Sequence, residues 1–480
     1  MKTLFVLRDI KMTERLGIMY LSAVAKNKGH DVDMIATDLE DIDKKMKSYK
    51  PDVLAYSVHT GEHKDVIKFN NELKKKYKFI SIFGGPHPTF FPEMIEEDGV
   101  DVICLGEGED AFEDFLDALK KKKPFNNIKN LWVKDAKGHV TKNPVRPLNG
   151  DLDSIPMPDR EMIYTYDESL FEEGEKRIIS GRGCPFRCTY CFNKHMSDLY
   201  GPSWGKVRKR SIDNIIAEVL EIKKKFPLEF IKFSDDTFIM CDIEWLKELA
   251  EKFPKKVGIP FFCNIRANLV TPQVVDYLKK AGCMSVFLAI EAADDEVRNG
   301  IMKRNMSKEQ INETCRLLRK AGIKYGFYNI LGLPVENKLE IDMDTLRYNI
   351  KLRPAMAWSS LLVPYPRTEL GDYCVVHGYF DGNYDNIRAN NKIESVLKFK
   401  DKREKRMVEN LQKLFGVTVA FPWMLPLTKQ LIKLPPNRVF MYALMGWYGY
   451  ALKIRMSTVK LTPGRLVKWV GVVRKHTKDY

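Results

Sequence analysis

The sequence predicts an α/β protein made of two successive strand–helix alternations and a mainly helical carboxyl-terminal region. Two observations carry this prediction. Short apolar runs alternate with amphipathic helical stretches over residues 1–125 and again over residues 177–370. A glycine- and cysteine-rich loop at residues 181–192 follows the first strand of the second alternation. Regular alternation of strands and helices is typical of parallel sheets.

The first alternation, residues 1–125, predicts five strands. Thr3 opens the first strand, and Gly29 ends the helix that follows it. The predicted strands are residues 3–7, 31–36, 52–58, 79–83 and 100–105, and the helices between and after them include 16–27, 38–49 and 110–121. This order predicts a doubly wound parallel sheet of the flavodoxin or Rossmann type.

Three loops follow strands of this predicted sheet, at residues 57–61, 84–88 and 106–109. Ligands of open α/β sheets bind beyond the carboxyl ends of the strands. Two of the loops are rich in glycine, which lets the backbone come close to a ligand. We therefore expect a binding site at this edge of the sheet.

The second alternation predicts six strands, after an irregular linker at residues 126–176 that contains Pro144, Pro147, Pro156 and Pro158. The strands are residues 177–180, 230–234, 261–266, 285–291, 326–331 and 357–363. Barrel enzymes place their chemistry at the carboxyl ends of such strands, so the polar residues that end them are candidates for the site.

The loop at residues 181–192 carries Cys184, Cys188 and Cys191. Thiolates prefer soft metals and iron–sulfur clusters. Three cysteines leave one iron of a four-iron cluster open, and an open coordination position marks a catalytic rather than a structural site. The other six cysteines lie singly along the chain and are expected to be core or incidental thiols.

The spacing Cys-x3-Cys-x2-Cys, with Tyr190 before the third cysteine, resembles the radical S-adenosylmethionine (SAM) superfamily. This resemblance implies a [4Fe–4S] cluster on Cys184, Cys188 and Cys191, with SAM bound to the open iron. It implies reductive cleavage of SAM to methionine and a 5′-deoxyadenosyl radical, with electrons from an external one-electron donor such as ferredoxin or flavodoxin. It also implies a partial (β/α)6 barrel over residues 177–395.

The same resemblance assigns SAM contacts. Tyr190 belongs to the cysteine motif, Asp235 and Glu291 end predicted strands, and Arg304 follows in Met302-Lys303-Arg304. The superfamily uses groups at these places for the amine and carboxylate of SAM. After Glu291 the sequence reads Ala-Ala where relatives usually have Ser-Gly, so the neighbouring contacts differ. Taken alone, each of these residues is also compatible with a helix cap or a surface ion pair.

The first alternation resembles the cobalamin-binding domain that precedes many radical SAM domains. Gly84-Gly85-Pro86-His87 and Gly106-Glu107-Gly108-Glu109 carry this resemblance. It implies cobalamin contacts from Ser57, His59, Gly84, Gly85, Glu107 and Gly108. The Asp-x-His-x-x-Gly motif is absent, so cobalt is expected to lack a histidine ligand from that motif. The alternative is a ligand-free flavodoxin-like domain that only shapes the active site.

The positive charge is concentrated at the carboxyl end. The chain of 480 residues has a formal net charge of +15, of which +14 lies in residues 398–480, and residues 410–478 contain no Asp or Glu. An anionic partner is expected. The aromatic run at 439–454 is too short to span a bilayer, which leaves a membrane-surface segment or a helical cap over the barrel mouth. Nucleic acid is the weaker alternative, because no binding motif occurs.

The composition is globular, with 44% apolar and 30% charged residues. The amino-terminal residues run directly into a strand without a signal peptide, and we expect a cytoplasmic protein, with membrane association as an open alternative. The predicted domains are residues 1–125, the linker 126–176, the barrel 177–395 and the basic helical region 396–480.

The function implied by the resemblance is cobalamin-dependent methylation, or related C–C bond formation, at an unactivated carbon of a hydrophobic small molecule. The enzymatic alternatives are an oxidative cyclase of the magnesium-protoporphyrin ester type and a methylthiotransferase. The non-enzymatic alternative is an iron–sulfur-stabilised adaptor for membrane or nucleic acid. Turnover of SAM to 5′-deoxyadenosine separates the enzymes from the adaptor.

Overall fold

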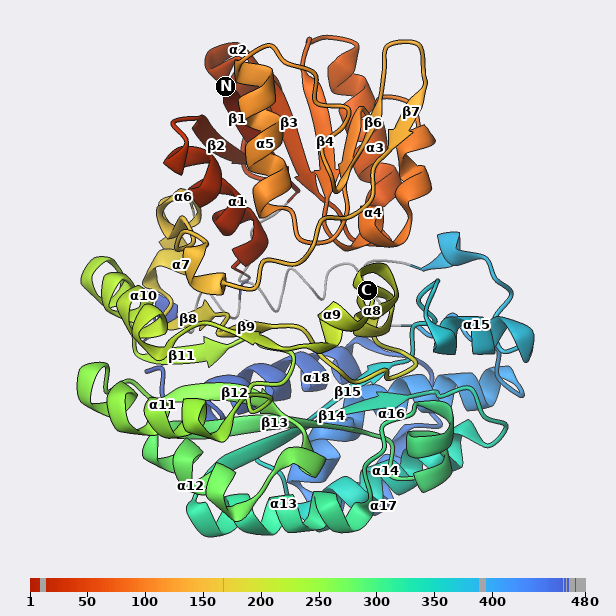
Figure 1. Cartoon of the computed structure of the whole chain (residues 1–480). Helices are drawn as coiled ribbons and strands as arrows, with labels where there is room; N and C mark the ends of the chain where they lie inside the picture. The colour runs from red at the N-terminus through yellow and green to blue at the C-terminus, as the bar shows by residue number, and fades with distance from the viewer. Residues whose placement is uncertain are drawn as a thin grey trace. The chain divides into compact units, whose positions relative to one another are not determined.

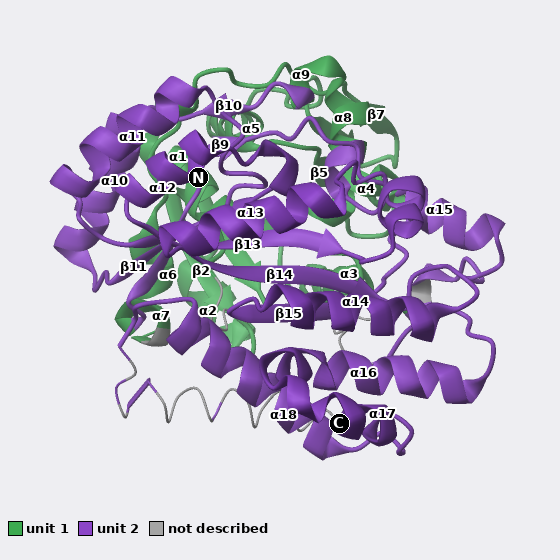
Figure 2. Ribbon diagram, turned by 90° about the horizontal axis from the view of Figure 1, so that it is seen from below, with its two compact units in different colours: residues 1–172, 195–204, 387–389 green, residues 173–194, 205–386, 390–480 purple. Residues whose placement is uncertain are grey.

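The computed structural model describes residues 1–8, 14–166, 168–387, 394–460, 462, 464, 465 and 471 (Figure 1). The chain forms two compact units (Figure 2). Unit 1 comprises residues 1–172, 195–204 and 387–389, and unit 2 comprises residues 173–194, 205–386 and 390–480.

The described residues of unit 1 contain a seven-stranded sheet in the order β2-β1-β3-β4-β5-β6-β7. Strands β1 to β5 are parallel, which confirms the predicted doubly wound sheet. The strands are β1 (Lys2–Leu7), β2 (Asp31–Ala36), β3 (Val53–Ser57), β4 (Ile80–Gly84), β5 (Val102–Cys104), β6 (Leu131–Lys134) and β7 (Val140–Lys142). The helices between them are α1 (Leu16–Asn27), α2 (Ile42–Tyr49), α3 (His63–Lys74), α4 (Pro86–Phe90), η1 (Pro92–Glu96) and α5 (Glu109–Lys120).

The segment predicted as an irregular linker has regular structure, so that prediction was wrong. Strand β6 pairs antiparallel with β5, and β7 pairs antiparallel with β6. Leu131 and Val133 alternate into the core while their neighbours are half-buried. A tight hairpin needs only such a short alternation, which the nearby prolines masked. The short helices η2 (Leu152–Ser154), α6 (Arg160–Tyr164) and α7 (Glu168–Glu172) follow. The domain boundaries at 125, 176 and 395 stay predictions.

Unit 2 is built on a parallel six-stranded sheet in the order β15-β14-β13-β12-β11-β8 in its described residues. The strands are β8 (Glu175–Ile178), β11 (Phe230–Phe233), β12 (Phe261–Ile265), β13 (Cys283–Glu291), β14 (Lys324–Leu331) and β15 (Met356–Leu361). The helices α10 (Ile212–Lys225), α11 (Ile243–Lys256), α12 (Pro272–Lys280), α13 (Lys308–Ala321) and α14 (Lys338–Leu352) connect them. Six strands with crossover helices form the expected curled half-barrel (Figure 1).

Shorter elements complete the described part of the chain. Strands β9 (Gly181–Arg182) and β10 (Arg208–Lys209) pair antiparallel. The remaining elements are α8 (Phe192–Tyr200), α9 (Pro202–Gly205), η3 (Ala267–Leu269), η4 (Glu296–Ile301), α15 (Glu369–Val376) and η5 (Tyr384–Asn386). Residues 195–204, which make up most of α8 and α9, belong to unit 1.

Side chains alternate between the two faces of the half-barrel sheet. Phe233 and Phe261 contact Phe253 of α11 in tilted and edge-to-face arrangements on the helix-covered face. Phe262 and Phe287 contact one another on the opposite face. Because successive residues of a strand point to opposite faces, the strand ends present their polar residues on the face that α11 does not cover.

The carboxyl-terminal region is helical, as predicted. It contains α16 (Lys402–Ala420), η6 (Pro422–Met424), α17 (Leu425–Leu431), α18 (Arg438–Tyr450) and η7 (Ala451–Arg455). Helix α16 packs its apolar side, including Val408 and Phe415, against Ala357 and Leu361 of β15. Residues 461, 463, 466–470 and 472–480 of the predicted basic region lie outside the described residues.

The predicted cap over the barrel mouth was wrong for the described residues. Ala451 and Met456 pack with Phe230, Phe262 and Met356. Those three side chains lie at the amino-terminal ends of β11, β12 and β15, whereas the mouth is formed by the carboxyl-terminal ends. The apolar run therefore closes the opposite end of the sheet.

Asp342 of α14 makes stability depend on pH. Its fully buried carboxylate accepts hydrogen bonds from the amide of Gly332, at 2.9 and 3.2 Å. Burial raises the pKa of Asp342 to about 8. An unfolded Asp titrates near pH ~4, so the folded state holds a proton that the unfolded state releases between these two pH values.

We expect this group to stabilise the fold fully below pH ~4 and to lose its contribution as pH rises to about 8, at up to ~1.4 kcal/mol per pH unit. Asp342→Asn should abolish that slope, because the amide does not titrate. Urea unfolding over this pH range measures it, with exposed Asp344→Asn as the control. Parallel stability curves for the Asp342→Asn and parent proteins would contradict the assignment.

Candidate active site

The three cysteines lie in a loop that is hydrogen-bonded to residues 301 and 302. Cys184 and Cys188 are buried, and Cys191 is half-buried. Thr189 anchors the loop, because its hydroxyl donates to the carbonyl of Ile301 at 2.8 Å and its amide donates to the carbonyl of Met302 at 3.2 Å. The cysteine loop and the segment that leads to Arg304 are therefore fixed to one another.

The donor set fits a cluster better than a single ion. Among the described residues, no three His, Cys, Asp or Glu side chains are arranged to hold one metal ion. A cubane cluster makes a different demand, because each of its three thiolates binds a different iron. Burial raises the pKa of Cys184 to about 11 and that of Cys191 to about 12. Iron would displace these protons, as a metal does from a coordinating thiol.

Two guanidinium groups face the sulfur of Cys188. Nη1 of Arg266 lies 3.6 Å from this Sγ and Nη1 of Arg304 lies 3.5 Å from it. Burial and the charge of Arg304 lower the pKa of Arg266. The Arg266 guanidinium lies over the ring of Phe186, with its Cζ 3.8 Å from the ring centroid. Two buried cations beside one sulfur are the environment that stabilises thiolates and an anionic cluster.

Tyr190, Glu291 and Arg304 form one hydrogen-bonded group. The Tyr190 hydroxyl donates to Glu291 Oε1 at 2.7 Å and accepts from Arg304 Nη1 at 3.0 Å. Arg304 Nη2 also donates to the carbonyl of Ala289 at 2.5 Å. Burial raises the pKa of Glu291, although Arg304 and Tyr190 act in the opposite direction. The structure therefore brings together three of the four residues predicted to contact SAM.

Strained backbone accompanies this group. Glu291, Lys303 and Asn305 have φ values of 67°, 49° and 49°, in the left-handed region that side chains other than Gly rarely adopt. The pairing of β13 with β14 also shifts between Ala289 and Glu291. Such strain costs of order 1–3 kcal/mol per residue and persists only where the surroundings enforce it.

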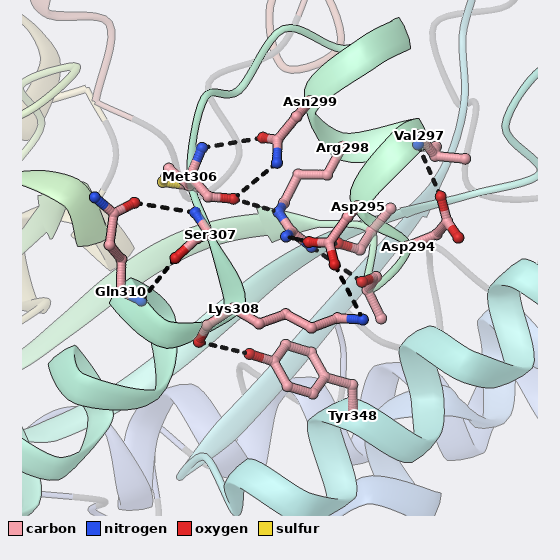
Figure 3. Close-up of polar contacts among 12 residues, drawn as sticks. Asp294, Asp295, Val297, Arg298, Asn299, Met306, Ser307, Lys308, Gln310 and Tyr348 are labelled. Carbon is pink, nitrogen blue, oxygen red and sulfur yellow. Dashed lines mark hydrogen bonds and ion pairs between the residues drawn. The ribbon is translucent and has the colours of Figure 1, made fainter.

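Arg298 holds this backbone in place through hydrogen bonds, among them the one to Met306 drawn in Figure 3. Its fully buried guanidinium donates to the carbonyls of Ala292 and Ala293, both at 3.0 Å, and to that of Met306 at 2.9 Å. It also pairs with Asp295. These bonds close the loop on both sides of Arg304. Sequence reasoning missed Arg298, because an arginine in a helical stretch normally indicates a solvated face.

The fourth predicted SAM contact, Asp235, has structural partners. It accepts from the amide of Ser180 at 3.1 Å, from the Ser180 hydroxyl at 2.6 Å and from Lys209 Nζ at 3.1 Å. These bonds join the ends of β8 and β11. Its neighbour Asp236 has an exposed side chain and acts electrostatically on Cys184 and Cys191. Although solvent reaches the Asp236 side chain, the surrounding protein still reduces its hydration, and this desolvation, together with the charge of Asp235, raises the pKa of Asp236 against the hydrogen bond with Asn193.

Three buried polar atoms near the strand ends lack a hydrogen-bond partner in the described part of the chain. They are Ser234 Oγ after β11, Asn264 Oδ1 in β12 and Arg304 Nε. An unsatisfied buried polar group costs ~1–3 kcal/mol, which a polar ligand would recover. These atoms fit a ligand that carries both donors and acceptors, as the amino-acid and nucleoside parts of SAM do. Sequence reasoning missed Ser234 and Asn264.

In unit 1, the three predicted loops follow the adjacent strands β3, β4 and β5. Gly85 has φ 93°, and a Cβ there would lie 3.1 Å from Ser57 Oγ. Thr89 joins the second loop to the third, because its hydroxyl donates to the Gly85 carbonyl at 2.9 Å and accepts from the Gly106 amide at 3.1 Å. The loops therefore share one edge of the sheet, as predicted.

Close neighbours within unit 1 explain why two of the loop positions, Gly85 and Gly106, have no room for a side chain. A Cβ on Gly106 would lie 1.9 Å from the hydroxyl of Tyr200, which accepts from the Glu107 amide at 2.9 Å. Gly85 is required by the end of β3, as described above. Gly84 has more room, with the nearest atom 4.0 Å from an added Cβ.

Two further residues predicted to contact cobalamin, His59 and Gly108, have close neighbours within this unit. The ring Nδ1 of His59 lies 3.1 Å from Glu62 Oε1. Gly108 lies directly before α5, and a Cβ there would lie 3.2 Å from Cys104 Sγ. The cobalamin contacts of these loops stay predictions.

Replacing Cys184, Cys188 or Cys191 by Ala is expected to remove the site-differentiated cluster, because a thiolate ligand of the cluster is lost. Iron and sulfide analysis after anaerobic reconstitution measures this loss. Cys315→Ala is the control, because this buried cysteine lies in α13 and outside the loop. Full iron content in the triple variant would contradict the assignment.

Arg266→Gln is expected to lower the reduction potential of the cluster by on the order of tens of millivolts, because a positive charge beside a ligand sulfur favours the reduced state. A redox titration followed by electron paramagnetic resonance measures the shift at matched iron content. Exposed Arg316→Gln is the control. An unchanged potential would show that Arg266 serves only to hold Arg304, to whose carbonyl its Nη2 donates a hydrogen bond.

Family models match both units. One described as the radical SAM superfamily matches residues 178–345, and one described as the B12 binding domain matches residues 11–116. The first includes the three cysteines, Tyr190, Glu291 and Arg304, and the second includes the three loops of unit 1.

Known proteins agree with these matches. The uncharacterized methyltransferase PH0819 of Pyrococcus horikoshii is 28% identical over 83% of this chain and 86% of its own length. An anaerobic magnesium-protoporphyrin IX monomethyl ester cyclase of Rubrivivax gelatinosus is 23% identical over 76% of this chain and 68% of its own.

The fold agrees as well. The cobalamin-dependent SAM radical enzyme OxsB, solved with aqua-cobalamin, aligns with 99% of this chain and 75% of its own at a TM-score of 0.65 and 17% identity. The chain therefore contains a radical SAM domain and a B12-binding domain.

Proposed function

We propose that this protein is a cobalamin-dependent radical SAM methyltransferase that acts on an unactivated carbon of a hydrophobic small molecule. The observation that carries the proposal is the group of Tyr190, Glu291 and Arg304 beside Cys188, in a chain that also has a B12-binding domain. The methyltransferase name of the Pyrococcus relative supports methyl transfer over the alternatives.

The residues of unit 2 have distinct tasks in this proposal. When bound, the cluster supplies the electron that cleaves SAM, and cobalamin carries the methyl group. Cys184, Cys188 and Cys191 hold the cluster. Arg304, with its unpartnered Nε, binds the SAM carboxylate. Glu291 keeps Tyr190 in position by accepting a hydrogen bond from its hydroxyl, and Tyr190 in turn accepts one from Arg304.

The SAM amine has two candidate partners. Asp235 is the residue that the resemblance assigns, but its carboxylate already accepts three hydrogen bonds. Asp236 is exposed and interacts electrostatically with two of the cluster cysteines. We propose that Asp236 faces the amine and that Asp235 fixes the adjoining strand ends.

In unit 1 we propose that Ser57, Gly84, Gly85, Glu107 and Gly108 contact cobalamin at the carboxyl edge of the sheet. His59 is bound to Glu62, which supports the expectation that cobalt takes no histidine ligand from this chain.

Radical SAM enzymes act on small molecules with an external reductant. The hydrophobic nature of the substrate is a proposal that rests on the aromatic and basic carboxyl-terminal region. A membrane surface stays a proposed partner. No helix of the described residues is long and apolar enough to cross a bilayer, so the contact would be peripheral.

The function is tested with anaerobic protein carrying its cluster and hydroxocobalamin, given SAM and a low-potential reductant. We expect both 5′-deoxyadenosine and S-adenosylhomocysteine, because reductive cleavage and methyl transfer leave different products. Glu291→Gln should reduce formation of 5′-deoxyadenosine at least ~10-fold at unchanged iron content, since a buried charge-assisted hydrogen bond is worth ~1.5–3 kcal/mol. Exposed Glu309→Gln is the control.

The products also separate the alternatives. Formation of 5′-deoxyadenosine without S-adenosylhomocysteine would favour the oxidative cyclase and count against methylation. Inorganic sulfide appearing in a methylthio product would favour the methylthiotransferase. Formation of neither nucleoside product would reject the enzymatic proposal and leave the iron–sulfur adaptor.

A further inference from the structure

Exposed apolar side chains are concentrated in one short segment of unit 2. Of the fourteen large apolar side chains that are exposed among the described residues, eight lie in residues 421–454. Trp423 is 73% exposed and Val439 is 69% exposed. The eight are Phe421, Trp423, Leu427, Leu434, Val439, Tyr442, Tyr450 and Ile454. We call these eight residues the apolar surface. Concentrations of this kind mark interaction sites.

Helix α18 and η7 expose one apolar face while a second face is buried. Phe440 packs in the same apolar cluster as residues of α16, Leu444 is buried, and the ring of Tyr448 contacts that of Trp358 at 4.3 Å between centroids. Val439 and Tyr442 are exposed in the first turn. Tyr450 follows Tyr442 by eight residues and Ile454 follows Tyr450 by four, spacings that keep them on the same side of the helix. The buried face already stabilises the fold, so packing within the described chain does not account for the exposed one.

Helices α17 and α18 both lie against α16 (Figure 2). Phe421 before η6 contacts Trp447 of α18 at 5.7 Å between ring centroids, and Trp447 contacts Tyr450 at 5.6 Å. These ring contacts connect Phe421, directly before η6, with Tyr450 at the end of α18. These two members of the apolar surface therefore belong to one row of contacting rings.

The charges beside the apolar surface are mainly positive, and the Glu173 carboxylate that reaches η7 is paired with Lys453 at 2.9 Å. Lys429, Lys433 and Arg438 are exposed and have no ion-pair partner in the described part of the chain. The sequence contains no Asp or Glu over residues 410–478. Exposed aromatic residues with unneutralised cations are typical of segments that lie in the headgroup region of a bilayer.

We propose that the apolar surface, with Lys429, Lys433 and Arg438, docks the protein peripherally on an anionic lipid surface. Charge complementarity selects this occupant. A second copy of the chain would bring like charges together, and a polyanion without an apolar phase would leave the apolar surface uncovered. The proposal is independent of the methyl transfer and goes beyond it, because it concerns where the enzyme works rather than what it does.

The full chain is tested by co-sedimentation with phosphatidylcholine vesicles that contain or lack phosphatidylglycerol. We expect binding only with phosphatidylglycerol, weakening as salt rises. Each basic residue near an anionic surface is worth ~1 kcal/mol, so the triple substitution Lys429→Gln, Lys433→Gln and Arg438→Gln should weaken binding on the order of 100-fold. A second variant, Trp423→Ser with Tyr442→Ser, should weaken binding while keeping its salt dependence.

The matched control replaces three exposed lysines elsewhere in unit 2, Lys224, Lys279 and Lys320, by Gln. It makes the same change in net charge and should bind like the parent protein. Equal loss of binding in this control would overturn the proposal in favour of a general charge effect. Absent or salt-independent pelleting of the parent protein would also overturn it, whatever the variants do. A dimer in light scattering that Trp423→Ser dissociates would assign the surface to a second copy.

Discussion

The active-site half of unit 2 depends on two buried guanidinium groups that face one cysteine sulfur. Arg266 and Arg304 both contact Cys188, and Glu291 is the acidic side chain bonded into the same group. Burying unneutralised cations costs free energy, so this arrangement is at its most stable when further negative charge is present. A thiolate-bound cluster and the carboxylate of SAM both supply such charge. The electrostatics of the chain are therefore matched to its cofactors.

The same charges must be held at fixed positions, and the chain does so with strained backbone secured by buried bonds. Left-handed residues flank Arg304 and occur at Glu291, and Arg298 closes the loop between them through three carbonyls. Thr189 then fixes the cysteine loop to that segment. Because these bonds are buried, a cofactor finds ligands that are already ordered, which lowers the entropy cost of binding.

The carboxyl-terminal helices serve the fold with one face and expose the other. Ala451 and Met456 close the amino-terminal end of the sheet, so this region leaves the carboxyl-terminal strand ends to the chemistry. The exposed face carries aromatic residues and the basic residues Lys429, Lys433 and Arg438. Burial explains the first face, and for the second we propose an outside partner.

The sequence by itself determined the two β/α alternations and the cysteine loop, because periodicity and motif spacing are local. The resemblance of its motifs, and the alignment of the carboxyl ends of parallel strands, indicated that Tyr190, Asp235, Glu291 and Arg304 would lie near that loop. It did not determine the hairpin β6–β7, whose strands are too short for a periodic signal. Nor did it reveal Arg298, Ser234 or Asn264, or that Asp235 is bonded to Ser180 and Lys209. Those roles depend on which side chains meet across strands far apart in sequence, and only tertiary packing decides that.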